Sequence, residues 1–76
     1  VVAPNPVGAL GLIYLPQNLG LIRTQLFTLS GQLIGERTIQ ADAGVLEYPT
    51  DELSSGIYLL SLEATNYTKT VKIIKQ

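Results

Sequence analysis

The chain has 76 residues with neither cysteine nor histidine, and its five basic and six acidic side chains give a net charge of −1. This length allows one domain, and an apolar share of 46% is typical of a folded chain. Without cysteine and histidine there can be no disulfide, no thiolate nucleophile and no histidine acid–base group. The basic residues form no cluster apart from three lysines near the end, so nucleic-acid binding is not expected. No apolar run approaches the roughly 20 residues of a transmembrane segment.

The first nine residues are predicted to form a linker, and residues 10–76 the domain itself. Pro4-Asn5-Pro6 places two prolines one residue apart, which favours an extended lead-in to the fold. Val1 is not an initiator methionine, and no charged segment precedes an apolar stretch. We therefore expect a domain of a larger protein, with any secretory signal upstream.

Short stretches of β-prone residues, separated by turn residues about every 10 positions, predict an all-β domain. The predicted strands span residues 10–15, 21–28, 32–39, 45–48, 57–64 and 67–75. This pattern is typical of an antiparallel β-sandwich or a small barrel of about six or seven short strands. Helical periodicity is sustained nowhere, and a single helical turn capped by Thr50 is the most that we expect, at residues 51–53.

Two connections have the composition of tight turns. Leu29-Ser30-Gly31 suits a three-residue hairpin with a bulge, because Gly31 can adopt the positive φ that this hairpin needs. Thr65-Asn66 suits a two-residue turn, because asparagine tolerates positive φ. The inward face of strand 21–28 stays open at this stage, since its aromatic residue, Phe27, shares a face with polar neighbours.

The segment Leu53-Ser54-Ser55-Gly56-Ile57-Tyr58 has the features of a tyrosine corner. In such a corner a tyrosine at the start of a strand packs inward while its hydroxyl bonds to the backbone upstream. Tyr58 would anchor the core in this way, and Gly56 would supply an unusual φ. The segment favours an immunoglobulin-like sandwich over a barrel.

The inventory of reactive side chains predicts that the domain is not an enzyme and needs no cofactor. The serines lack a histidine base, and no nucleophile turn surrounds any of them. Four carboxylates could in principle bind calcium, but solvated loop carboxylates are far more common. These are Asp42, Glu47, Asp51 and Glu52.

Three lysines lie among β-branched residues in the last predicted strand: Lys69, Lys72 and Lys75. Lysines on an edge strand block aggregation between sheets. Alternatively, a partner could bind the exposed strand end. The residues by themselves favour the first interpretation.

Four segments in this order and spacing resemble the C-terminal sorting domain of type IX (Por) secretion system cargo proteins. They are Pro4-Asn5-Pro6, then Leu26 to Leu33 with its Leu-Ser-Gly turn, then Leu53 to Tyr58, then Val71-Lys72-Ile73-Ile74-Lys75. Departures from the family pattern are Val7 for an aromatic residue, Thr28 for aspartate, Gln32 for lysine and Ser54-Ser55 for Pro-Ala.

The resemblance implies an address label rather than an enzyme. Such a domain directs a passenger from the periplasm to the outer-membrane surface or the extracellular space, through the type IX translocon and an outer-membrane shuttle protein. A cell-surface sortase usually then removes it. The resemblance assigns recognition to Lys72, Ile73, Ile74 and Lys75. It assigns structural roles to Pro4, Pro6, Gly31, Leu53, Gly56 and Tyr58.

Two alternatives remain beside the sorting signal. One is a structural or adhesive sandwich that binds carbohydrate or protein, although its aromatic residues are scattered: Tyr14, Phe27, Tyr48 and Tyr67. The other is a weak homodimer formed by edge pairing of the last strand, which is compatible with a sorting signal.

Overall fold

The computed structural model describes residues 2–3, 10–41 and 43–75, and in this part of the chain it contains seven strands. Their bounds are β1 Val2–Ala3, β2 Leu10–Tyr14, β3 Leu21–Thr28, β4 Leu33–Gln40, β5 Val45–Pro49, β6 Gly56–Ala64 and β7 Tyr67–Lys75. Two of the predicted strands, β3 and β7, have the predicted bounds; β2, β5 and β6 differ by one residue at one end, and β4 is shifted by one residue at both ends. The sequence did not predict β1, which pairs with β2 within the segment expected to be a linker.

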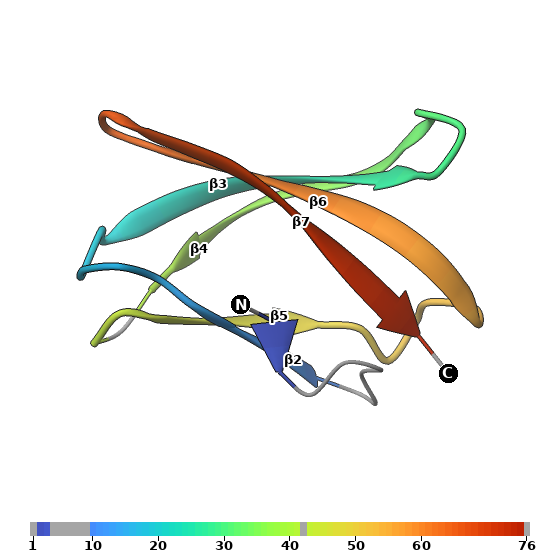
Figure 1. Cartoon of the computed structure of the whole chain (residues 1–76), viewed down its shortest axis with the longest axis horizontal. Coiled ribbons are helices and arrows are strands. Elements are labelled where there is room, and N and C mark those ends of the chain that lie inside the picture. The colour runs from blue at the N-terminus through green and yellow to red at the C-terminus, as the bar shows by residue number, and fades with distance from the viewer. Residues whose placement is uncertain (1, 4–9, 42, 76) are drawn as a thin grey trace.

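The strands form two antiparallel sheets, ordered β1-β2-β5 and β4-β3-β6-β7 (Figure 1). This is the immunoglobulin-like arrangement in which the first, second and fifth strands face a sheet with the third and sixth at its centre. The predicted all-β sandwich is therefore confirmed. No described residue is helical: the expected turn at residues 51–53 is a single hydrogen-bonded turn, in which Leu53 N–H donates to the Thr50 carbonyl at 3.1 Å.

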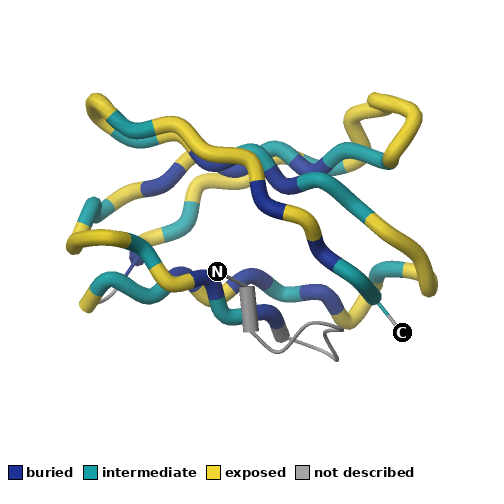
Figure 2. The backbone as a smooth tube through the Cα atoms, in the orientation of Figure 1, coloured by how far each residue is buried: buried dark blue, intermediate teal, exposed yellow. Residues whose placement is uncertain are grey.

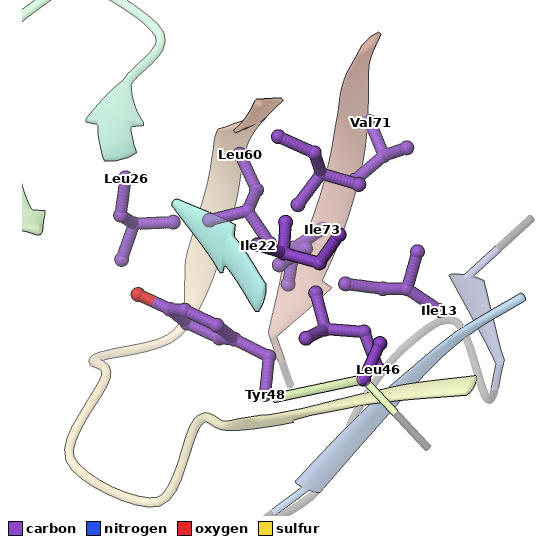
Figure 3. Packing of buried hydrophobic residues seen from close by; sticks show 10 residues of the cluster. Ile13, Ile22, Leu26, Leu46, Tyr48, Leu60, Val71 and Ile73 are labelled. Carbon is purple, nitrogen blue, oxygen red and sulfur yellow. The ribbon is translucent and has the colours of Figure 1, made fainter. Parts of the chain in front are cut away.

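The core lies between the two sheets and receives side chains from both (Figures 2 and 3). Its fully buried members are Ile13 and Leu46 from one sheet and Ile22, Leu60, Leu62 and Ile73 from the other. Strand β3 turns Ile22, Thr24 and Leu26 inward, which answers the question that its sequence left open. Phe27 lies on the opposite, outer face.

The predicted tight turns form as expected. Gly31 has φ of 93°, and its N–H donates to the Thr28 carbonyl at 3.0 Å. Thr28 N–H donates in turn to the Gln32 carbonyl at 2.9 Å, which closes a three-residue loop between β3 and β4. Asn66 has φ of 58° in the turn between β6 and β7.

Candidate functional site

Strand β7 holds all four predicted recognition positions and lies at one edge of the four-stranded sheet. It pairs with β6 along its whole length, in a register that places Lys72 opposite Leu59 and Lys75 opposite Gly56. The predicted edge position of the last strand is thus confirmed. The end of β7 is held beside the start of β6, close to the loop that connects the two sheets.

Alternation along β7 gives the four recognition positions different surroundings. Ile73 is fully buried and lies opposite Tyr58 on the inner face. Lys72 is exposed on the outer face, and Ile74, on the same face, is half-buried opposite Ile57. Lys75 is half-buried. A partner of the folded domain could therefore contact Lys72, Ile74 and Lys75, whereas Ile73 acts by holding the strand in the core.

An apolar row crosses the outer face of the four-stranded sheet and ends at Lys72. The register places Leu33 beside Phe27, Phe27 beside Leu59, and Leu59 beside Lys72. Leu33 is 48% exposed, and Ile57, in the next row, is 41% exposed. The outer surface near the end of β7 therefore combines apolar side chains with a lysine.

The other end of this outer face is polar. Arg23 Nη2 lies 2.8 Å from Glu36 Oε2, and Arg23 Nη1 lies 3.6 Å from Glu63 Oε1. The hydrogen bond from Arg23, helped by one from Gln25, holds the pKa of Glu36 below its usual value. The bond to Glu36 likewise raises the pKa of Arg23. These groups are exposed, so the network adds little stability.

The loop before β6 forms the predicted tyrosine corner. The Tyr58 hydroxyl donates to the Ser54 carbonyl at 2.7 Å, and its ring lies under Gly56, whose φ is 155°. Leu53 is half-buried against the core. Because Gly56 pairs with Lys75, the corner also fixes the backbone next to the end of β7.

The remaining predicted motif residues have simpler outcomes. Gly31 holds the β3–β4 turn as described above. Pro4 and Pro6 lie outside the described residues. Within the described residues, no group of three or more potential metal-binding side chains comes together, and no helix is long and apolar enough to cross a membrane.

Sequence reasoning gave no role to Arg37, and it counted Tyr48 only among the scattered aromatic residues. The Arg37 guanidinium lies 5.6 Å from the centre of the Tyr48 ring. These side chains come from different sheets, so the sequence of either strand alone could not have predicted the contact between them. The other aromatics are dispersed: Tyr14 is 49% exposed on β2, Phe27 is on β3 and Tyr67 begins β7. The described residues therefore form no shared aromatic platform for a sugar.

Comparison with known families gives a match over the whole chain. Residues 1–76 match the family described as the secretion system C-terminal sorting domain of the Por system. The chain belongs to this family. No curated protein matches the chain. As a C-terminal sorting domain of the Por, or type IX, secretion system, the chain is a non-catalytic module that interacts with that secretion machinery and is bound for the outer membrane or the exterior.

Two departures of this sorting domain from the family pattern are accommodated by backbone bonds. Ser54 replaces a proline, and its carbonyl accepts the Tyr58 hydroxyl. Gln32 replaces the turn lysine, and its carbonyl closes the hairpin with Thr28. Both contacts use main-chain oxygen atoms, so the substituted side chains do not disturb the turns.

Proposed function

We propose that this sorting domain carries a larger passenger from the periplasm across the outer membrane, and that the end of β7 is the part that an outer-membrane shuttle protein binds. The observation that most supports this proposal is the alternation of buried and exposed side chains along β7. Val71 and Ile73 are buried in the core, whereas Lys72 is exposed and Ile74 half-buried on the outer face. A folded domain thus presents these side chains in one fixed arrangement.

A preformed strand end suits recognition because its ordering cost is met during folding rather than during binding. Pairing with β6 fixes the backbone from residue 67 to residue 75. The tyrosine corner fixes the loop beside it. Apolar neighbours such as Leu59 and Ile57 give the partner surface area, while Lys72 and Lys75 supply charge for orientation.

The later steps of the proposal rest on family membership. A cell-surface sortase removes the domain after translocation and attaches the passenger to anionic lipopolysaccharide. The domain therefore passes through the periplasm and ends at the outer-membrane surface or in the extracellular space.

A reporter fusion tests this function. An inert reporter with a periplasmic signal peptide is joined to residues 1–76 and expressed in cells with a type IX system. We expect the fusion at the cell surface or in the medium. The same reporter without the domain, and the fusion in cells without the translocon, should both stay in the periplasm. Retention of the complete fusion in competent cells would contradict the proposal.

Self-association through the edge of β7 is a separate proposal. Edge strands can pair with a second copy of the same chain. Light scattering at several protein concentrations would show a rise in mean mass if this pairing occurs. A constant monomer mass would dismiss the homodimer and leave the sorting function untouched.

A further inference from the structure

A groove of about 440 Å³ opens between β4 and the loop at residues 51–54. Its floor includes Leu26, Tyr48 and Tyr58. One wall is the β4 segment at residues 34–37. The groove therefore lies along the edge of the four-stranded sheet opposite to the proposed recognition strand.

The groove exists because β4 contributes little packing at this end. Gly35 and Arg37 lie opposite Leu26 and Thr24, whose side chains point into the core. A Cβ atom added to Gly35 would lie 3.9 Å from Leu26 Cβ and 4.0 Å from the Tyr48 hydroxyl, which is ordinary contact distance. Glycine thus leaves room for a methyl group beside Leu26 and Tyr48.

The Tyr48 hydroxyl opens into this space. Tyr48 is only 4% exposed, and Figure 3 shows its oxygen directed away from Leu46 toward the side of Leu26. The hydroxyl lies at the floor of the groove, 4.0 Å from the position that a Cβ atom on Gly35 would take. Burial raises the pKa of Tyr48, so the group is a neutral donor at physiological pH.

Arg37 adds further donors to the same groove. Its guanidinium lies over the Tyr48 ring, and the ion pairs found in the described part of the chain involve Arg23 instead. Asp51 and Glu52 also line the groove and are exposed. A ligand here meets donors at the floor and acceptors at the rim, and a free anion would be repelled by the two carboxylates.

The backbone of β4 completes the site. In the described residues β4 pairs with β3 along one side only, and it is the most exposed long strand. The other edge of a terminal strand presents N–H and C=O groups that an extended peptide can pair with. The groove thus offers a strand edge next to a pocket for one side chain.

We propose that this groove binds an extended peptide of a partner protein, which pairs with the outer edge of β4 and inserts an uncharged amide side chain beside Tyr48. The amide oxygen accepts from Tyr48 and Arg37, and its NH₂ group donates to Asp51 or Glu52. A glutamine or asparagine side chain satisfies both kinds of group, whereas a carboxylate satisfies only the donors. This contact is independent of recognition at β7.

The test is a titration of the ¹⁵N-labelled 76-residue chain with the peptide acetyl-Thr-Val-Gln-Val-Thr-amide, followed by NMR. We expect shifts concentrated at residues 34–37 and around Tyr48. Tyr48→Phe should weaken binding about three- to tenfold, the effect of one lost hydrogen bond. Thr68→Ala, at an exposed position on β7, should bind as the unaltered chain does.

Two altered peptides separate the parts of the proposal. A peptide with every backbone amide N-methylated can donate no hydrogen bond to a strand edge, so we expect no binding. Replacement of its glutamine by glutamate should weaken binding. Equal binding of either altered peptide, absence of shifts at β4, or shifts confined to β7 would overturn the proposal. Concentration-dependent shifts at β4 without peptide would also overturn it, because a second copy would then be the occupant.

Discussion

Tyr58→Phe isolates the energetic contribution of the tyrosine corner. The substitution keeps the ring against Gly56 and removes only the hydroxyl that donates to Ser54 at 2.7 Å. A hydrogen bond of this kind contributes about 0.5–1.5 kcal/mol. Ser54 is exposed, so its carbonyl can bond to water after the change, and we expect a loss of about 1 kcal/mol. In a domain of this size that corresponds to a fall in Tm of about 4–8 °C.

The measurement is thermal and urea unfolding followed by circular dichroism. Tyr48→Phe is the matched control, because it removes a tyrosine hydroxyl and leaves the bond between Tyr58 and Ser54 intact. We expect a smaller fall in Tm than Tyr58→Phe gives, since the bond of the corner is kept. Equal destabilisation by the two substitutions, or no effect of Tyr58→Phe, would refute the assigned corner.

Three further outcomes follow from packing, backbone geometry and titration. Ile73→Ala should cost about 2–5 kcal/mol because Ile73 is fully buried, whereas Ile57→Ala, on the outer face, should cost less than half as much in urea unfolding. Gly31→Ala should lower the free energy of unfolding by about 1–2 kcal/mol because φ is 93°. Gly31→Asn should lower it less, because asparagine tolerates positive φ and no neighbouring atom crowds either side chain. The raised pKa of Tyr48 gives stability that is present below its unfolded pKa of about 10 and is lost as pH rises through the folded pKa. Alkaline unfolding curves should show this loss in the unaltered chain, and a smaller one in Tyr48→Phe.

Features set by neighbouring residues could be predicted from the sequence. The hairpin at Gly31, the turn at Asn66 and the corner at Tyr58 each depend on residues within about four positions. Glycine and asparagine tolerate the required φ, and the corner has its own short pattern. Local chemistry therefore sufficed for the turns and, through their spacing, for the sandwich.

Features set by distant residues could not be predicted. Phe27 lies on the outer face because its neighbours there are Leu33 and Leu59, which are apolar too. The two-residue strand β1 forms only by pairing with β2. The groove beside Tyr48 depends on how β4 and β5, from different sheets, lie relative to each other.

The recognition residues were suggested by family resemblance, and their burial refines the hypothesis. Four consecutive positions were predicted as one motif, but alternation along β7 buries Ile73 and exposes Lys72. Removing residues 71–76 would take both Val71 and Ile73 from the core. Such a truncation would therefore confuse loss of folding with loss of recognition.

The most direct test of the sorting function is the surface-exposed fraction of the reporter fusion carrying Lys72→Ser and Lys75→Ser together. Its matched control is Lys69→Ser, which removes another exposed lysine of β7 outside the proposed recognition residues. Unfolding curves of the purified variants establish that each remains folded. We predict that the double variant accumulates in the periplasm while the Lys69→Ser fusion reaches the surface. Normal surface delivery of a folded double variant would contradict recognition at the end of β7.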